Sequence, residues 1–273
     1  MKTLTPPETT LGHDRVRQNV RQHYGRVASE PRACGCAPTC CTPGAGSAEE
    51  LAHRLGYDAT QTSAVPEGAN LGLGCGNPHA IAGLKPGQTV LDLGSGAGFD
   101  AFLAARAVGG EGKVIGVDMT PEMISKARAN AATTGLTKVE FRLGEIENLP
   151  VADASVDVIL SNCVINLSPD KARVFAEAFR VLKPGGRLAI SDVVALQPVP
   201  QALREDVQLH AACASGAALV NEVETLLRDA GFTEIRVTPK PESRAVIQEW
   251  FPGKGLEDLF ASATIEAVKP LRA

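Results

Sequence analysis

The chain has 273 residues, 44% of them hydrophobic, and a formal net charge of -4 at pH 7. This length and composition support one large α/β domain with additions, and the charge, without a basic stripe, argues against nucleic acid as the main partner. No segment reaches the roughly 18 uninterrupted apolar residues of a membrane span. Because Met1–Asp14 is polar without a hydrophobic signal core, we expect a soluble cytoplasmic protein with no membrane partner.

A polar, partly helical start, Asp14–Ser29, precedes a segment that holds four of the seven cysteines, Cys34, Cys36, Cys40 and Cys41. The Gly and Pro content of this segment predicts a loop. Clustered cysteines in a chain of this size indicate reduced thiols used for chemistry or metal binding, not a secreted disulfide framework. Four thiolates could complete a structural zinc site, although the spacing lacks the usual Cys-x-x-Cys pairs.

A second irregular stretch, Val65–Pro78, leads through a short helix into a region where strands and helices alternate. Apolar runs predict seven strands, at Val90–Leu93, Lys113–Asp118, Val139–Leu143, Val156–Leu160, Arg187–Ser191, Thr233–Val237 and Ala261–Val268. Helical periodicity predicts helices at Phe99–Ala107, Pro121–Ala132, Ser168–Leu182, Leu203–Ala214 and Glu222–Ala230. We expect Thr120 to be an N-cap, Lys183–Gly186 to stop a helix, and Pro239–Leu259 to connect the last two strands.

This order of elements predicts an α/β fold. We expect a Rossmann-like, seven-stranded, mostly parallel sheet with helices on both faces and an N-terminal helical and loop extension. The last strand is expected to be an antiparallel edge strand, because it would be made from a final hairpin.

The turn after the first predicted strand carries Gly94, Gly96 and Gly98 and leads directly into a helix. Without Cβ atoms there, backbone amides at the positive helix end can approach the polar groups of a bound cofactor. The spacing is one residue tighter than the dinucleotide fingerprint, and the second strand ends at Asp118, which can accept hydrogen bonds from ribose hydroxyls. A purely structural turn is the alternative, but the acidic strand end favours a nucleotide-type cofactor.

Two cysteines follow predicted strands, Cys163 after the fourth and Cys213 after the fifth. Side chains there can face the cleft at the carboxyl ends of a parallel sheet, where ligands bind. Considered alone, each is more simply a small packing residue. Asp157 and Asp192 are interpreted as structural caps near strand ends, and the five histidines show no metal-ligand spacing.

The glycine turn, the acidic end of the second strand and Leu182–Gly186 before the fifth strand resemble the class I S-adenosylmethionine-dependent methyltransferases, over roughly Lys85–Val268. Through this resemblance we assign to the cofactor site Asp92, Gly94, Ser95, Gly96 and Gly98 around the methionine portion, Asp118 at the ribose, Met119 at the adenine, Gly144, Glu145 and Ile146 at the adenine edge, and Asn162. The fold by itself does not choose a substrate.

The cysteines and their neighbours resemble the arsenite methyltransferases over nearly the whole chain. The features that carry this resemblance are Ser161–Leu167 around Cys163 with Pro-Asp-Lys behind it, Cys213 before Ser-Gly-Ala, Gly-Cys-Gly at Cys75, and the Cys40-Cys41 pair. It implies that Cys163, Cys213 and Cys75 bind arsenic, that Cys41 or its neighbour Cys40 joins the redox cycle, and that Tyr24-Gly25 approaches the cofactor. Leu73 departs from the animal relatives, which carry an aromatic residue there.

The resemblance implies methylation of arsenite, or of its thiol conjugates, for detoxification. Trivalent arsenic is soft and binds thiolates, and its remaining lone pair can attack a sulfonium methyl group. Methylation formally oxidises arsenic, and electrons from cysteine thiols would return it to the trivalent state. We therefore expect S-adenosylmethionine as the methyl donor and an external thiol reductant, thioredoxin or glutathione.

We divide the chain at residue 84. Residues 1–84 are expected to form an N-terminal extension with the cysteine-rich loop and segments that cover cofactor and substrate, and residues 85–273 a class I methyltransferase domain with C-terminal arsenic-site and edge-hairpin additions. Two alternatives remain at this point: a methyltransferase for a carbon, nitrogen or oxygen acceptor, and a thiol-based metalloid or zinc sensor. If the cysteine-rich loop does not bind zinc, we interpret it as a mobile arm that captures arsenic or resolves a disulfide.

Overall fold

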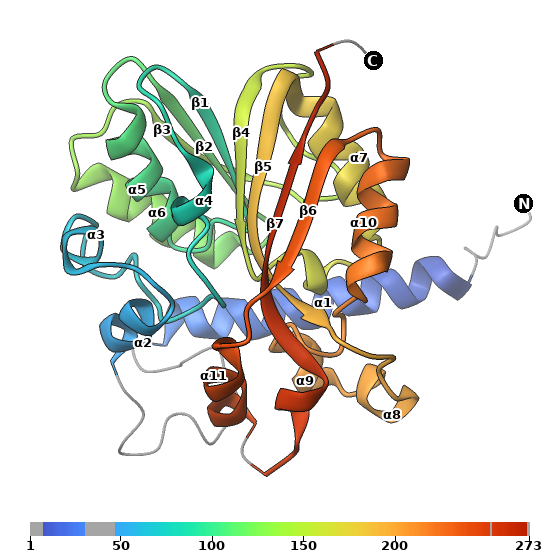
Figure 1. The fold of residues 1–273 in the computed structure, drawn as a ribbon. Helices are drawn as coiled ribbons and strands as arrows, with labels where there is room; N and C mark the ends of the chain where they lie inside the picture. The colour runs from blue at the N-terminus through green and yellow to red at the C-terminus, as the bar shows by residue number, and fades with distance from the viewer. Residues whose placement is uncertain (1–7, 31–46, 252, 272–273) are drawn as a thin grey trace, which may run out of the picture.

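The computed structural model describes residues 8–30, 47–251 and 253–271. Its strands are β1 (Thr89–Leu93), β2 (Lys113–Asp118), β3 (Val139–Leu143), β4 (Val156–Asn162), β5 (Leu182–Ala195), β6 (Thr233–Pro239) and β7 (Phe260–Val268). They form one sheet in the order β3-β2-β1-β4-β5-β7-β6 (Figure 1). Neighbouring strands are parallel, except that β7 is antiparallel to both β5 and β6. The predicted Rossmann-like, mostly parallel sheet and its antiparallel last strand are confirmed. The expected edge position of the last strand was wrong, because β7 lies between β5 and β6, and β6 forms the edge.

The helices are α1 (Glu8–Ser29), α2 (Ala48–Arg54), α3 (Ala59–Ser63), α4 (His79–Ala82), α5 (Phe99–Val108), α6 (Pro121–Ala132), α7 (Lys171–Val181), α8 (Gln201–Arg204), α9 (Val207–Ala211), α10 (Val220–Asp229) and α11 (Ser243–Trp250), with the 3-10 turns η1 (Ile165–Leu167) and η2 (Leu256–Asp258). In the part of the chain that the structure describes, none of these helices is both long and apolar enough to span a bilayer.

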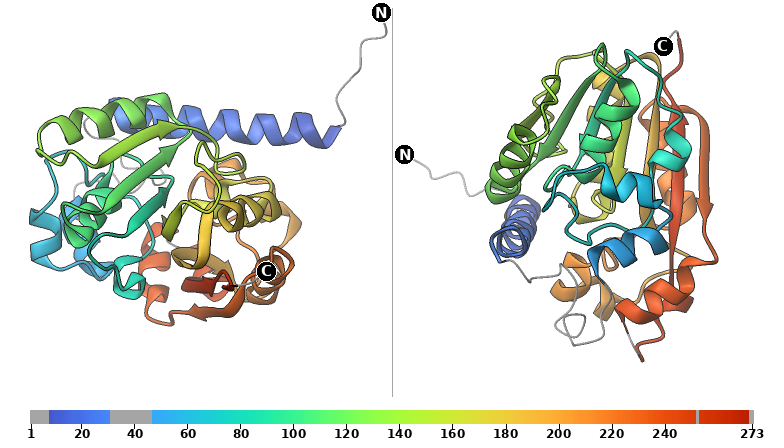
Figure 2. Two further views of the ribbon diagram at one scale, coloured as in Figure 1. Left: turned by 90° about the horizontal axis from the view of Figure 1, so that it is seen from above. Right: turned by 90° about the vertical axis from the view of Figure 1, so that its left-hand side faces the viewer.

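Helices cover both faces of the sheet (Figure 2). Successive strand residues point to opposite faces, so Val90 packs in one apolar cluster with α4, α5 and α6, whereas Leu91 packs in another with α7 and α10. Both residues are fully buried. Burial on both faces explains why the central strands are continuous apolar runs.

The carboxyl ends of the parallel strands form the edge that matters for function. Helix α1 lies across this edge and contacts α6, α9 and η1 (Figures 1 and 2). An open parallel sheet binds its ligands outside these strand ends. The long first helix is therefore a cover over the ligand side of the sheet.

The segment Lys183–Gly186, predicted to stop a helix ahead of the fifth strand, lies inside β5, which begins immediately after α7. Gly185 donates its amide to the Lys269 carbonyl, and the Lys269 amide donates to the Gly186 carbonyl. The pairing of β4 with β5 shifts register between Val156 and Val158. Strands tolerate Pro and Gly at such an irregularity, so the expected strand start at Arg187 was wrong, although α7 does end at Val181, just before this segment.

The predicted helix Leu203–Ala214 is also wrong, because two short helices, α8 and α9, take its place. Asp206 lies between them, and its carboxylate accepts a hydrogen bond of 3.1 Å from the Leu209 amide at the start of α9. After α9 ends, Cys213 adopts a φ of 61°, which the right-handed helix does not allow. Cys213 therefore lies in a turn, not on a helix face.

Other boundaries differ without changing the topology. Helix α1 begins at Glu8, earlier than the expected Asp14, and the predicted connection Pro239–Leu259 contains α11 and η2. Strand β5 continues beyond the expected end at Ser191, so Asp192 is a strand residue. Thr120 is the N-cap of α6 as predicted, but its side chain makes no capping hydrogen bond.

Candidate active site

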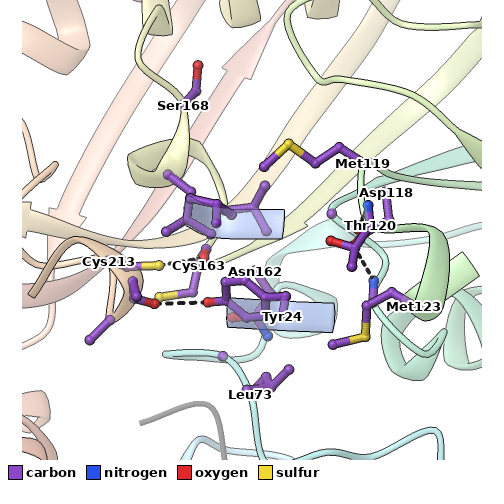
Figure 3. Close-up of a pocket in the computed structure, with 18 of the residues that line it drawn as sticks. Tyr24, Leu73, Asp118, Met119, Thr120, Met123, Asn162, Cys163, Ser168 and Cys213 are labelled. Carbon is purple, nitrogen blue, oxygen red and sulfur yellow. Dashed lines mark hydrogen bonds between the residues drawn. The ribbon is translucent and has the colours of Figure 1, made fainter. Parts of the chain in front are cut away.

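A pocket lies at the carboxyl ends of the parallel strands, between the glycine turn and α1 (Figure 3). The predicted site residues that line it are Tyr24, Gly94, Gly96, Asp118, Met119, Gly144, Ile146, Asn162, Cys163 and Cys213. A smaller adjoining pocket is lined by Asp92, Gly94, Ser95, Gly96 and Asn162, among others. The structure thus brings together residues from both the expected cofactor set and the expected thiol set.

Three predicted cofactor residues, Gly25, Gly98 and Glu145, and Cys75 are not among the residues that line either of the two pockets. A Cβ added to Gly25 on α1 would lie 3.2 Å from the Glu122 carboxylate, so this glycine lets α1 approach α6. A Cβ on Gly98 would lie 2.6 Å from the Phe102 ring. Glu145 forms ion pairs with two arginines of α1. The structure thus gives Gly25 and Gly98 a role in close packing and Glu145 a role in attaching α1.

The glycine turn after β1 is built around a close contact with the chain after β4. Gly94 has a φ of 64°, and a Cβ there would lie only 2.2 Å from Val164 Cγ2. Both the left-handed backbone and the contact therefore require glycine. Gly96 also has a positive φ, 51°, but the nearest atom to an added Cβ would be Met123 Sδ at 4.0 Å.

Asp92 and Ser95 present buried polar atoms to the smaller pocket. Asp92 Oδ2 and Ser95 Oγ have no hydrogen-bond partner among the described residues. Burial, followed by the nearby Asp100 and Asp118 carboxylates, raises the pKa of Asp92 well above its usual value. An unpaired buried carboxylate is costly, so this arrangement fits a ligand that brings a cationic hydrogen-bond donor, such as an ammonium group.

Asp118 ends β2 and helps hold the turn. Its Oδ2 accepts a 3.0 Å hydrogen bond from the Gly96 amide and its Oδ1 accepts one of 2.8 Å from the Thr120 amide. Burial raises the pKa of Asp118, and these amides oppose the rise. Each carboxylate oxygen still has a lone pair for a ligand hydroxyl.

The three described cysteines are free thiols from separate parts of the chain: Cys75 precedes β1, Cys163 follows β4 and Cys213 follows α9. Cys163 and Cys213 both have left-handed backbones, with φ values of 59° and 61°. Such conformations are strained for residues with a Cβ and cluster at functional sites. The Cys163 amide donates to the Ser191 carbonyl at 2.8 Å, which holds the turn against β5.

The thiols interact with one another inside an apolar wall. Hydrogen bonding with Cys213 and then Cys75, together with burial, raises the pKa of Cys163 well above its usual value. Burial is the main cause that raises the pKa of Cys75. Without a bound ligand, these two thiols are therefore neutral near pH 7. They are not a preformed anionic cluster.

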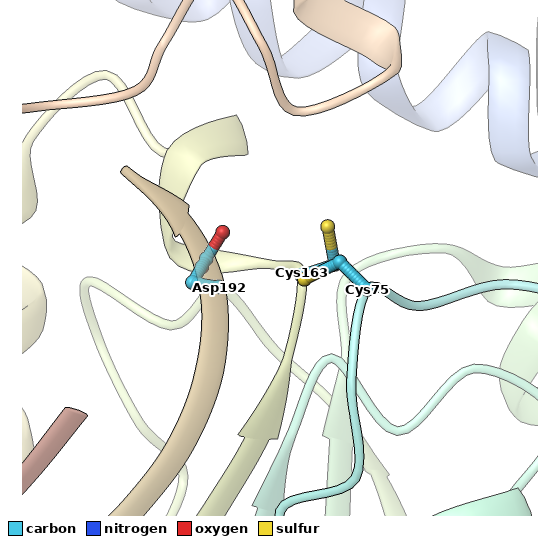
Figure 4. A group of neighbouring side chains, drawn as sticks. All are labelled: Cys75, Cys163 and Asp192. Atoms are coloured by element: carbon cyan, nitrogen blue, oxygen red, sulfur yellow. The ribbon is translucent and has the colours of Figure 1, made fainter. Parts of the chain in front are cut away.

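Sequence reasoning missed Asp192 as a site residue. A carboxylate oxygen of Asp192 and the sulfurs of Cys75 and Cys163 all lie within 4.8 Å of one another (Figure 4). Burial raises the pKa of Asp192 to about 6. The signal available from the sequence was its position one residue after the predicted end of the fifth strand, where side chains can turn toward the cleft.

Asn162, which was predicted as a cofactor residue, also fixes the segment that carries Cys75, and sequence reasoning missed this second role. Asn162 Oδ1 accepts from the Cys75 amide at 3.0 Å, and Asn162 Nδ2 lies 2.8 Å from the Gly76 carbonyl. The same nitrogen reaches Tyr57 Oη at 3.0 Å and Asp100 Oδ2 at 3.2 Å. Asn162 thus joins the thiol segment to α5, beside the cofactor turn.

Helix α1 is attached over the pocket by polar contacts. Arg17 pairs with Glu145 at 3.3 Å and with the buried Glu147 at 3.1 Å, and Arg21 pairs with Glu145 at 3.2 Å. Tyr24 Oη donates to the Ala211 carbonyl at 3.1 Å. Tyr24 therefore connects the cover to the chain just before Cys213. The predicted residues Cys40 and Cys41 lie outside the described residues.

Comparison with known proteins identifies the family. Residues 84–231 match a methyltransferase domain family model. The chain is 49% identical to the arsenite methyltransferase of Halobacterium salinarum, over 99% of this chain and 72% of that protein, and 39% identical to that of Aquipseudomonas alcaligenes, over 81% and 63%. The crystal structure of the arsenic(III) S-adenosylmethionine methyltransferase from Chlamydomonas reinhardtii is 36% identical, with a TM-score of 0.62 over 82% of this chain and 74% of that one. The chain belongs to the arsenite methyltransferase family, within the class I S-adenosylmethionine-dependent methyltransferases.

Proposed function

We propose that this protein methylates trivalent arsenic held by Cys75, Cys163 and Cys213, and that it serves arsenic detoxification. The observation that carries the proposal is the interaction of Cys163 with two other free thiols, Cys75 and Cys213, from separate parts of the chain, at the pocket that Cys163 and Cys213 line. Three sulfur donors match the three coordination positions of trivalent arsenic, and soft thiolates are its preferred ligands.

The neutral state of the thiols suits arsenite as the incoming substrate. Arsenite is uncharged As(OH)3 near neutral pH, and each thiol can exchange for one hydroxyl, so that a sulfur–arsenic bond forms and a water molecule leaves. The thiol proton leaves in that water, so no buried thiolate has to be stabilised beforehand. The raised pKa values of Cys75 and Cys163 are therefore compatible with capture of a neutral arsenic species.

The residues of the glycine turn fit S-adenosylmethionine, which supplies an electrophilic methyl carbon when bound. In this proposal the unpartnered Asp92 Oδ2 and Ser95 Oγ receive its ammonium end, while Gly94 and Gly96 leave room for close approach. Asp118 holds the ribose, and Met119 with Ile146 packs on the adenine. All of these residues line one of the two adjoining pockets.

The chain's part in methyl transfer is alignment and exclusion of water. The arsenic lone pair forms the new carbon–arsenic bond while the methyl–sulfur bond breaks, and that electron pair stays on the departing sulfur. No proton has to be removed by the protein. Tyr24 and the rest of α1 cover the pocket and keep water from the thiol-bound arsenic.

Methylation oxidises arsenic formally by two electrons. We propose that two cysteine thiolates return these electrons by forming a disulfide, with Cys41, or its neighbour Cys40, as the N-terminal member of the redox cycle. An external thiol reductant, thioredoxin or glutathione, would then reduce the disulfide for the next turnover. In the same proposal residues 1–84 act as the covering extension of the methyltransferase domain, because α1 contacts both sides of the pocket.

Chromatographic separation of arsenic species tests the proposal. The reduced protein is incubated with S-adenosylmethionine, arsenite and a dithiol, and methylated arsenic is expected only when all are present. Cys163→Ser and Cys213→Ser should abolish the product while S-adenosylmethionine still binds. Absence of methylated arsenic from the wild-type reaction contradicts the proposal. Serine variants that still methylate an organic acceptor would favour the carbon, nitrogen or oxygen alternative.

A further inference from the structure

We propose that Asp192 makes the thiol site a binding site for a closed-shell divalent cation, Zn²⁺ or Cd²⁺, that competes with arsenite. This goes beyond methyl transfer, although it shares Cys75 and Cys163 with the proposed function. Its basis is the group of two sulfurs and one carboxylate oxygen that lie within 4.8 Å of one another (Figure 4).

The separation of these atoms is close to what a tetrahedral ion needs. With metal–sulfur bonds of about 2.3 Å and metal–oxygen bonds of about 2.1 Å, ligand atoms of a tetrahedral site lie roughly 3.6–3.8 Å apart. The three observed donor atoms would have to approach by only about an ångström. Rotation of the thiol side chains can supply a change of that size.

Asp192 is oriented as a metal-binding carboxylate usually is. Its Oδ2 accepts from the Ile165 amide at 2.9 Å, and its Oδ1 accepts from the Asn166 side-chain amide at 2.9 Å and from the Val193 amide at 2.8 Å. These donors fix the carboxylate next to the sulfurs. In metalloproteins, hydrogen bonds from surrounding groups orient the metal-binding side chains in the same way. Oδ2 keeps a lone-pair position available to a cation.

The carboxylate also distinguishes the two classes of ligand. Trivalent arsenic is complete with three sulfur donors and carries a lone pair in the remaining direction. Zn²⁺ and Cd²⁺ favour four ligands and accept oxygen as well as sulfur. Cys213, whose sulfur interacts with Cys163, is the natural fourth donor. Asp192 is thus needed by the cation, and arsenic does not require it.

A partly buried lysine provides a second way to test the site. Lys171 interacts electrostatically with both Asp192 and Cys213. When Cd²⁺ replaces the protons of the three neutral thiols, which pass to the buffer, the site gains two positive and three negative charges and becomes more negative. Removing the Lys171 charge should therefore weaken cation binding. Arsenite exchanges its hydroxyls for the thiols with release of water and no change in charge, so its binding should be little affected.

The experiment is a titration of the full-length chain with CdCl₂ in the absence of S-adenosylmethionine. Cys34, Cys36, Cys40 and Cys41 are first replaced by serine, so that these four thiols do not bind the probe. Ultraviolet charge-transfer absorption reports cadmium–thiolate bonds, and the ¹¹³Cd chemical shift reports the mixture of sulfur and oxygen donors. We expect one saturable site with both donor types, from which arsenite displaces Cd²⁺.

Asp192→Asn should raise the dissociation constant for Cd²⁺ at least about tenfold relative to that for arsenite, and Lys171→Met should raise it about threefold. Absence of saturable binding, equal weakening of both ligands by Asp192→Asn, or tighter cadmium binding in Lys171→Met overturns the proposal. If Asp192→Asn fails to fold, the proposal is decided by the donor types that the ¹¹³Cd chemical shift reports and by the dissociation constant for Cd²⁺ of Lys171→Met. Because the titration contains no methyl donor, its result does not depend on methyl transfer. A protein that binds Cd²⁺ in the titration, but makes no methylated arsenic in the separate incubation with S-adenosylmethionine, contradicts only the proposed function.

Discussion

The thiol of Cys213 donates a hydrogen bond of 2.7 Å to the backbone carbonyl of Cys163 (Figure 3). The two residues are 50 positions apart in the chain, and both have a positive φ. The contact therefore joins two strained turns, one after β4 and one after α9. Strain of this kind persists only where the surroundings hold it, and here the Cys213 thiol helps to hold the turn at Cys163.

The strain predicts an unusual order of stability for substitutions at Cys213. Glycine adopts a φ of 61° without a steric penalty, so Cys213→Gly should be more stable than Cys213→Ala by about 1 kcal/mol. Urea unfolding of both variants measures this difference. The matched control is Ala129→Gly on the exposed face of α6, which should lose about 1 kcal/mol. A Cys213→Ala variant as stable as Cys213→Gly would show that the turn carries no strain.

The glycine turn predicts different effects for two neighbouring substitutions. Gly94→Ala places a Cβ 2.2 Å from Val164 Cγ2, so we expect a lower melting temperature and loss of S-adenosylmethionine binding. Gly96→Ala meets no atom closer than 4.0 Å and should cost only the strain of its positive φ, about 1 kcal/mol. Thermal unfolding and calorimetric titration measure the two effects. Val164→Ala should partly restore the stability of Gly94→Ala, and no restoration would argue against the contact.

The hydrogen bonds of Asn162 hold the segment that carries Cys75, so we expect Asn162 to affect the affinity for arsenite. Asn162→Ala removes the acceptor of the Cys75 amide and the donor to the Gly76 carbonyl, so the third thiol should become mobile and arsenite binding should weaken about tenfold. Trp250 is the sole tryptophan and lines the pocket, so its fluorescence can follow the titration. Tyr57→Phe, which removes one partner of the same network, should have a smaller effect. Unchanged arsenite affinity in Asn162→Ala would contradict this role.

The sequence predicted the sheet and the cofactor turn well because both are local patterns. Val90, Leu91 and Leu93 are apolar, the following glycines need their backbone freedom, and Asp118 ends the next strand. The proximity of Asp192 to Cys75 was not predictable in this way, since it depends on where β5 ends and how the segment before β1 returns to the sheet. Cys213 was placed on a helix because Asp206, which divides that helix, resembles any polar surface residue in the sequence.

Asp192 also predicts how stability depends on pH. Its pKa is raised from 3.8 to about 6 by burial, against the attraction of Lys171 and the hydrogen bonds from Val193, Ile165 and Asn166. Between these pH values the unfolded chain loses the proton while the folded chain keeps it, so stability falls as pH rises. A difference of about 2.2 pKa units corresponds to about 3 kcal/mol. The penalty is absent below pH 3.8 and complete above about pH 6.

Comparison of the wild type with Asp192→Asn isolates this group, because asparagine does not titrate. The free energy of unfolding of the variant, minus that of the wild type, should increase by about 3 kcal/mol from pH 4 to pH 7, as measured by urea unfolding across that range. Glu177→Gln is the control of opposite sign. Hydrogen bonds from Arg180 lower the pKa of Glu177, so its contribution is present above its unfolded pKa and lost as pH falls. A flat difference for Asp192→Asn would mean that the carboxylate titrates in the folded protein as it does in the unfolded chain, and that its burial among the thiols carries no electrostatic cost.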